Sequence, residues 1–447
     1  MIDIKALRAD PQRFIDGARK KQMDVDIKSI LEMDAQILKF QQELQDLRTQ
    51  QNAASKDIAK LKGPEKQAAI DQMSTLKARA KELGDQIAAL EPQFNDLLMV
   101  VPQPPDADIP VGKDATGNKE IRRWNSPWFD TTKSFEANKG FKPKSHIELG
   151  MALGMMDFER GVKMAGSRSY VLMGTGMRLH QAVLRFAFDF MVNEQGFTPV
   201  SVPVLVREEM MVGTGFFPFG KEQAYEVGEK ERGGGYDLYL TGTGEVGLMG
   251  LHSGEILDEA TLPRKYITLS TCFRREAGAA GKDTAGLYRI HQFDKLEQVV
   301  LCQADEAQSR QWHTTMIGFV EQILRRLEIP HRLLQCCTGD LGPKNADMID
   351  IESWMPSRGK VGPDGTSEGE FGETHSASRL YDYQCRRLNL RYRDAEKKVQ
   401  VCHSLNNTVA ASPRILIPIM ELYQNADGTI TVPTALRPYM GGLEKIG

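Results

Sequence analysis

Residues 271–300 read TCFRREAGAAGKDTAGLYRIHQFDKLEQVV. Two segments rich in aromatic and β-branched residues flank a Gly/Ala/Lys/Asp loop, and both segments carry several charges. This composition is typical of two β-strands joined by a loop, a β-hairpin. We predict strands over residues 272–276 and 288–297, joined by a loop over residues 277–287.

Alternate residues of a strand point to the same face of the sheet. Residues Arg274 and Glu276 would then share a face, as would Arg289, His291, Phe293, Lys295 and Glu297, with Ile290 and Leu296 on the opposite face. Such a face suits a planar, anionic ligand. From charge alone, a solvent-exposed edge hairpin with cross-strand ion pairs is an equally good interpretation.

The composition limits the class of protein. The chain has 447 residues, of which 41% are hydrophobic and 26% charged, with a net charge of -3. This length allows two or three domains, and the charge balance means that nucleic-acid binding must depend on local basic patches. No apolar run has the length of a membrane span, and we find no targeting segment. The six cysteines include no CxxC pair, so we expect a reduced, zinc-free protein of the cytoplasm.

Residues 28–91 have a different pattern from the rest of the chain. Apolar residues recur at spacings of three and four through Ile30, Met33 and Ile37, and again from Met73 to Leu90 after Gly63 and Pro64. The pattern predicts an antiparallel two-helix coiled-coil arm with Gly-Pro at its turn. Either dimerisation or contact with a large partner would explain such an arm. The lysines near the turn are Lys56, Lys60, Lys62 and Lys66. Clustered lysines can bind phosphate groups, although a solvated helix tip is the simpler interpretation.

The rest of the chain follows a proline-rich linker at residues 100–112. Beyond it, helical and strand patterns mix without regular βαβ alternation, so we expect an α+β domain around a largely antiparallel sheet. An apolar-rich helix over residues 179–192 leads into a strand that Pro199 and Pro203 confine to an edge, and an edge of this kind often faces another subunit. We place the domains at residues 1–105 and 106–447.

Two nucleotide-binding motifs are present only in part. The stretch GFFPFGK at 215–221 has Glu222 where a phosphate loop needs Ser or Thr. The stretch GTGEVG at 242–247 fits a dinucleotide-binding pattern but lacks the surrounding βαβ pattern. We reject both.

The segment CFRREAGAAGKDTAGLYRIHQFDKLE closely resembles the second signature motif of class II aminoacyl-tRNA synthetases, in the form found in the bacterial-type seryl-tRNA synthetase family. The resemblance extends to the two-helix arm, to HIELG at 146–150, to MDFERGVKMAGSR at 156–168, and to a third motif in PRILIPIMELYQNADGTITVPTALRPYMGG at 413–442. It implies a class II catalytic domain with an antiparallel sheet, a tRNA-binding arm and a homodimer.

The resemblance also implies an ATP site. Arg274 would hold the α-phosphate, Glu276 would bind the adenine amino group, and Phe293 would stack on the adenine. Arg289 and Arg437 would reach the terminal phosphates. The matching metal ligands, Glu373 and Ser376, would bind Mg²⁺ between the phosphates. These roles suit displacement at phosphorus, which needs oriented and neutralised oxygens.

The amino-acid pocket implied by the resemblance comprises Thr243, Glu245, Glu297 and Thr408, together with Arg274. Glu297 would bind the ammonium of serine. Thr408 is expected in a loop before the third motif, where a helix N-cap is its alternative role. The chain departs from the family pattern in having TGE for TAE at 243–245, NNTV for NGSG at 406–409, and a longer loop over residues 357–372. These departures concern the shape of the serine pocket.

The implied activity is ligation of serine to serine tRNA through a seryl adenylate, and whether selenocysteine tRNA is also charged is left open. Two alternatives remain. A relative that activates an amino acid for another acceptor would lack the arm, and a silent, non-catalytic relative would lack Arg274, Arg437 or Glu373.

Overall fold

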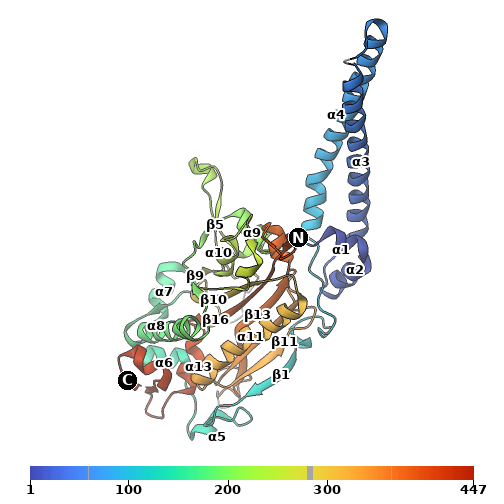
Figure 1. Ribbon diagram of the computed structural model, residues 1–447. Coiled ribbons are helices and arrows are strands. Elements are labelled where there is room, and N and C mark those ends of the chain that lie inside the picture. Colours follow the sequence, from blue (N-terminus) through green and yellow to red (C-terminus); the bar gives the residue numbers. More distant parts are fainter. Residues whose placement is uncertain (59, 279–284, 364) are drawn as a thin grey trace. The chain divides into compact units, whose positions relative to one another are not determined.

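The computed structural model describes residues 1–447 except 59, 279–284 and 364. The chain divides into two compact units, Met1–Pro104 and Pro105–Gly447 (Figure 1). Each unit has its own core, and we describe each separately. Among the described residues, no helix combines the length and apolarity that crossing a membrane requires.

The first unit consists of helices. They are α1 (Ile4–Ala9), α2 (Pro11–Lys20), α3 (Ile27–Ile58) and α4 (Gly63–Met99). The long helices α3 and α4 lie side by side, with buried Ile30, Ile37, Met73, Leu83 and Ile87 between them (Figure 1). The predicted two-helix arm is confirmed.

One charged residue of α3 is buried beside the predicted arm seam. Asp34 is buried, whereas Met33 is partly buried, as are the other predicted seam residues Phe40, Leu44 and Leu47. Arg8 of α1 makes this burial possible, since its Nε and Nη2 donate to the Asp34 carboxylate at 2.5 and 2.8 Å. A buried charge needs such a partner.

The second unit is built on an eight-stranded sheet. In spatial order its strands are β1 (Lys119–Trp124), β11 (His331–Gln335), β12 (Asp347–Met355), β13 (Glu370–Tyr381), β16 (His403–Ser412), β10 (Gln292–Cys302), β9 (Arg264–Phe273) and β4 (Thr198–Pro199). All neighbours are antiparallel except β4 and β9. The predicted antiparallel α+β fold and the edge position of the Pro199 strand are therefore confirmed.

Within the described residues, ten further strands form four small sheets. They are β15 (Val399–Val401), β14 (Arg391–Arg393) and β8 (Ile256–Asp258); β5 (Leu205–Arg207), β7 (Leu238–Leu240) and β6 (Tyr225–Val227); β17 (Ile430–Thr431) and β18 (Lys445–Ile446); β2 (Met156–Asp157) and β3 (Val171–Leu172). GTGEVG follows β7, which pairs antiparallel with both of its neighbours. This supports rejecting a dinucleotide site there.

The helices of the second unit are α5 (Phe135–Lys139), α6 (His146–Ala152), α7 (Phe158–Ala165), α8 (Gly174–Asp189), α9 (Glu208–Gly213), α10 (Glu245–Gly250), α11 (Glu306–Arg326), α12 (Tyr383–Arg387) and α13 (Leu416–Leu422). Helix α8 continues as a π-helical turn, Phe190–Glu194, so the predicted helix over residues 179–192 is confirmed.

The two faces of strand β10 have different environments. Leu296 and Val300 belong to the main hydrophobic core, which includes residues of α8 and α11. Phe293 and Lys295 line a pocket, as expected for residues on the opposite face. Helices α8 and α11 therefore cover the face of β10 that carries Leu296 and Val300, and the candidate site lies on the face that carries Phe293 and Lys295.

Candidate active site

The predicted strands of the hairpin are too long toward the loop. Strand β9 ends at Phe273 and β10 begins at Gln292, so Arg274, Glu276, Arg289 and His291 lie in the connecting segment. Arg274 still donates its N–H to His291 O at 2.9 Å, but Arg275 donates to Gln223 O at 3.0 Å instead of to a strand partner. Glu276 has a φ of 54°, outside the β region. Residues 279–284 of the predicted loop lie outside the described residues.

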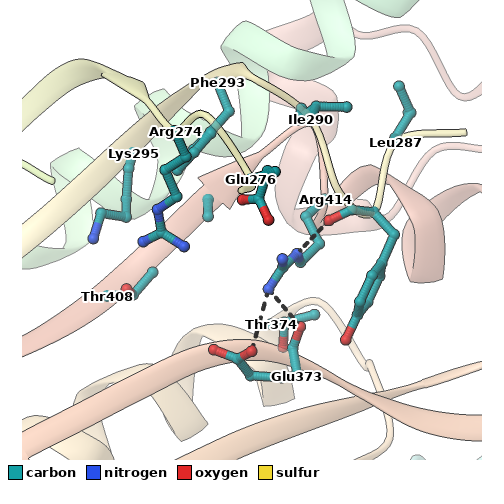
Figure 2. Close-up of a pocket in the computed structure, with 12 residues that line it drawn as sticks. Arg274, Glu276, Leu287, Ile290, Phe293, Lys295, Glu373, Thr374, Thr408 and Arg414 are labelled. Atoms are coloured by element: carbon teal, nitrogen blue, oxygen red, sulfur yellow. Dashed lines mark hydrogen bonds and ion pairs between the residues drawn. The ribbon is translucent and has the colours of Figure 1, made fainter. Parts of the chain in front are cut away.

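The connecting segment nevertheless brings its charged side chains to a pocket (Figure 2). Arg274, Glu276 and Phe293 line it together with Glu373, Thr408 and Arg414. The Arg274 guanidinium carbon lies 5.2 Å from the centre of the Phe293 ring. A flat ring beside a guanidinium is suited to a base next to a phosphate.

Glu276 and Arg289, expected at opposite ends of the nucleotide, contact each other. Arg289 Nη1 lies 2.6 Å from Glu276 Oε2, and both side chains are largely buried. Arg289 lines a second pocket that shares Arg274 and Glu276 with the first. Nucleotide binding in the expected pose therefore requires the Arg289–Glu276 pair to separate.

Arg437 is not among the residues that line either pocket. It lies in the 3₁₀-helical segment Thr434–Met440, and its guanidinium contacts Glu444 at 2.8 Å. Arg414 lines the first pocket instead: its Nε donates to Tyr288 O at 3.0 Å and its Nη1 to Glu373 O at 3.1 Å (Figure 2). Arg414 immediately follows β16 in the quoted third-motif segment, and its position directly after a central strand is the signal that was overlooked.

A β-bulge brings the expected metal ligands together. Glu352 pairs with Glu373 and Ile351 pairs with His375, so Thr374 is the extra residue of β13. In a regular strand, Glu373 and Ser376 would point to opposite faces, because they are three positions apart. Because Thr374 is accommodated as an extra residue, Ser376 is opposite Asp350 and shares a face with Glu373.

The electrostatics of this region suit a hard cation. Burial, with repulsion from the nearby Glu373 carboxylate, raises the pKa of Asp350 well above its usual range. Cys336, Asp340 and Asp350 also bring ligand atoms within 4.8 Å of one another. Carboxylate and hydroxyl oxygens are ligands suited to Mg²⁺, so Glu373 and Ser376 fit this ion. The expectation that no zinc is bound stays a prediction.

The expected ammonium ligand, Glu297, lies at the centre of a polar group. It is 1% exposed, and its cross-strand neighbours are Thr408 on β16 and Thr268 on β9. The Thr243 hydroxyl donates to Glu297 Oε2 at 3.1 Å. Lys295, to which the resemblance assigned no role, pairs with the same carboxylate (salt bridge between Nζ and Oε2).

Thr408 is in a strand and is neither in a loop nor at a helix N-cap, which corrects our expectation. Leu296 pairs with Ala410 and Glu297 with Thr408, so Val409 is the extra residue of a second bulge. As a result Thr408 and Ala411, three positions apart, both line the pocket.

Glu245 is buried but is not among the pocket-lining residues. Its Oε1 accepts from Lys344 Nζ, Gln384 Nε2 and Asn406 Nδ2 at 2.8, 2.6 and 2.8 Å. The structure therefore places it in a hydrogen-bonded network beside Thr243, whose hydroxyl accepts from the Glu245 N–H at 3.2 Å.

The structure also explains the Gly in TGE. A Cβ at position 244 would collide with Cγ2 of Thr268 and would lie 3.0 Å from Ser270 Oγ. A glycine lets this turn approach strand β9 closely.

The four lysines near the turn of the arm are exposed: Lys56, Lys60, Lys62 and Lys66. Lys60 lies 3.5 Å from Asp57, an exposed pair of little energetic value. These lysines therefore present positive charge to solvent.

An antiparallel sheet that carries a basic and aromatic pocket beside a carboxylate–hydroxyl pair is the catalytic architecture of class II aminoacyl-tRNA synthetases. Residues 225–423 match the family described as tRNA synthetase class II core domain (G, H, P, S and T), and residues 1–105 match the seryl-tRNA synthetase N-terminal domain. A serine–tRNA ligase of Deinococcus radiodurans is 40% identical over 455 residues, covering 100% of this chain and 99% of the relative. The chain belongs to the seryl-tRNA synthetase family, and it is accordingly a ligase that forms aminoacyl-tRNA.

Solved structures agree with this assignment. The crystal structure of seryl-tRNA synthetase from Pyrococcus horikoshii complexed with ATP has a TM-score of 0.87 and 35% identity, covering 100% of this chain and 99% of that one. A cytoplasmic serine–tRNA ligase from Naegleria fowleri in complex with AMP has a TM-score of 0.84 and 29% identity, covering 98% and 95%.

Proposed function

We propose that this chain activates L-serine with ATP to seryl adenylate and transfers the seryl group to the 3′ end of serine tRNA. The observation that carries the proposal is the shared pocket. Arg274, Phe293 and Arg414 offer a nucleotide site, and Thr408 joins it to the buried carboxylate of Glu297.

In the first step, a carboxylate oxygen of serine forms a bond to the α-phosphorus of ATP. The bond from that phosphorus to the oxygen bridging the β-phosphate breaks, and pyrophosphate leaves. Arg274 holds the α-phosphate and Phe293 stacks on the adenine, while Glu276 binds the adenine amino group after Arg289 leaves it. Once the nucleotide is bound, fixed charges of this kind stabilise the transition state without further reorganisation.

The terminal phosphates are bound by Arg289 and Arg414. Arg414 replaces Arg437 in this role because it lines the pocket and Arg437 pairs with Glu444 away from the lining residues. Glu373 and Ser376 would hold Mg²⁺, which supplies charge neutralisation at the phosphates when bound.

In the second step, a hydroxyl of the terminal ribose of the tRNA attacks the carbonyl carbon of the adenylate. AMP leaves, and the hydroxyl proton passes to one of its phosphate oxygens. The arm supports tRNA as the acceptor, because its exposed lysines Lys56, Lys60, Lys62 and Lys66 can contact phosphates.

The working form is proposed to be a homodimer in the cytoplasm. The edge strand β4, limited by Pro199, suits a subunit contact. All six cysteines are free and buried, which suits a reducing compartment.

The test is serine-dependent exchange of pyrophosphate into ATP, followed by charging of serine tRNA. We expect both activities from the full chain, and Arg274→Ala should reduce exchange at least about a hundredfold. Pyrophosphate exchange without charging of any tRNA would favour the alternative that the chain activates an amino acid for an acceptor other than tRNA. No exchange with any amino acid by folded protein would overturn the proposal.

A further inference from the structure

A buried lysine occupies the centre of the proposed amino-acid pocket. Lys295 and Glu297 are 6% and 1% exposed, and they lie two positions apart on β10, so both side chains point to the pocket face. Lys295 Nζ donates to Thr243 Oγ1 at 2.8 Å and pairs with the Glu297 carboxylate. The position expected for the ammonium of the substrate is thus filled by an ammonium of the chain.

We propose that Lys295 neutralises Glu297 while the pocket is empty, gives way to the ammonium of serine, and then binds the carboxylate of serine. The inference rests on the proposed function, since it assigns a residue to the binding of that substrate.

Charge balance supports this exchange. Glu297 and Lys295 together are neutral, as a buried site requires. Serine adds one positive and one negative charge, so the four charges can alternate: Glu297 carboxylate, serine ammonium, serine carboxylate, Lys295 ammonium. Without Lys295, the carboxylates of Glu297 and serine would be balanced only by the serine ammonium and by Arg274, which is also expected to hold the α-phosphate.

The hydrogen bonds also leave room for a ligand. An ammonium has three N–H donors, and Thr243 and Glu297 take two of them. Within the part of the chain that the structure describes, no acceptor is recorded for the third. Lys295 lines the pocket beside Arg274, and in Figure 2 the nitrogens of both side chains point toward Thr408. The carboxylate that attacks phosphorus would lie between these two cations.

The test compares L-serine with serinamide, which keeps the ammonium and hydroxyl but has a neutral amide in place of the carboxylate. Binding of each is measured by calorimetry on the full chain, at a pH where both amines are protonated. The wild type is expected to bind serine at least about tenfold more tightly than serinamide, a difference on the scale of one charge-assisted contact. Lys295→Met should bring this ratio close to one, and Lys295→Arg should restore part of it.

Two controls make the result specific. Lys265→Met changes a lysine of the neighbouring strand whose Nζ donates to Gln195 O at 2.7 Å outside the pocket, and it should leave the ratio unchanged. Lys295→Gln keeps donors for Thr243 and Glu297 without the charge, and it replaces Lys295→Met if the latter does not fold. The KM for ATP should change less than the KM for serine in each Lys295 variant.

The outcomes separate the two proposals. An unchanged serine-to-serinamide ratio in Lys295→Met and Lys295→Gln, with serine activation by the wild type, would overturn the role of Lys295 alone. Failure of the folded wild type to bind serine or to catalyse serine-dependent exchange would overturn the proposed function and this inference with it.

Discussion

At the scale of single residues, two arginines of the C-terminal segment have different environments. Arg414 is largely buried beside Glu373 in the pocket, while the partner of Arg437, Glu444, is 72% exposed. A guanidinium at a fixed site in a pocket stabilises charge that develops on a substrate. An exposed ion pair contributes little.

We therefore expect Arg414→Ala to reduce serine-dependent pyrophosphate exchange at least about a hundredfold. Arg437→Ala should stay within about threefold of wild type, because it removes an ion pair with an exposed carboxylate and one hydrogen bond from Nε to Val432 O at 3.2 Å, both away from the pocket-lining residues. Both are measured as kcat/KM for ATP, with thermal unfolding as the check on folding. A larger loss of activity in Arg437→Ala than in Arg414→Ala would indicate that Arg437, and not Arg414, binds the terminal phosphates.

We expect Thr408 to contribute to the exclusion of threonine. It lies across from Glu297 and lines the pocket, and its methyl group would occupy space that the extra methyl of a threonine substrate needs if its hydroxyl faces the substrate. Discrimination by one methyl group amounts to roughly 10–200-fold.

Accordingly, Thr408→Gly should raise the ratio of threonine to serine activation by about tenfold or more. Thr408→Ser is the matched control and should retain serine activation. The ratio comes from kcat/KM values for pyrophosphate exchange with each amino acid. If Thr408→Gly leaves it at the wild-type value, exclusion of threonine depends on other residues.

At the scale of elements, buried ion pairs join the strands beside the site. Asp347 of β12 accepts from Gln335 of β11 at 2.7 Å, and it lies 3.3 Å from His313 of α11 and 2.9 Å from Arg379 of β13. Burial alone would raise the pKa of Asp347, but its contacts with His313 and Arg379 outweigh this and lower it to about 2.

An acid with a lowered pKa in the folded state stabilises the fold above its unfolded pKa of about 3.9 and loses this contribution as the pH falls toward the folded value. Asp347→Asn should thus lower the free energy of unfolding by about 2 kcal/mol at pH 7. The gap between variant and wild type should stay constant from pH 7 to about 5 and narrow below about pH 4. Denaturant unfolding at several pH values gives this gap, and a gap that widens with acid would contradict the assignment.

The elements also show how far the sequence could predict the site. Periodicity correctly placed Phe293, Lys295 and Glu297 on one face of β10, because this part of the strand keeps its alternation relative to β9. It placed Arg274 and Glu276 in a strand that ends before them, since the pairing of Arg275 with Gln223 and the positive φ of Glu276 depend on a distant loop. The resemblance, and not the pattern, identified Glu373 and Ser376, whose spacing of three contradicts strand alternation until the bulge at Thr374 is seen.

At the scale of the whole molecule, the chain combines a catalytic unit with a helical unit that has its own core. The two-helix arm was predictable from local periodicity, and the antiparallel sheet from the lack of regular βαβ alternation. The position of Arg414 in the pocket was not predictable, because it depends on where the chain runs after β16.

The four lysines near the arm turn are Lys56, Lys60, Lys62 and Lys66. Replacing all four by Gln should weaken the binding of serine tRNA and leave serine activation unchanged. In a plot of the logarithm of the tRNA association constant against the logarithm of the salt concentration, the slope should become shallower. The change should be up to about 0.9 for each tRNA phosphate that these lysines neutralise in the wild type. The matched control replaces four exposed lysines further from the turn: Lys28, Lys39, Lys77 and Lys81. Equal weakening in both variants would indicate a general charge effect in place of a specific contact at the turn.

The two bulges mark the positions at which β13 and β16 can change length. Deletion of Thr374 or Val409 removes the extra residue of a bulge, so the flanking residues keep their cross-strand partners and their faces. Deletion of a regularly paired residue instead turns every later side chain of the strand to the other face. Members of the family can thus lack a residue at these two positions and keep the same side chains at the site, whereas an alignment gap elsewhere in either strand assigns the following residues to the wrong side of the sheet.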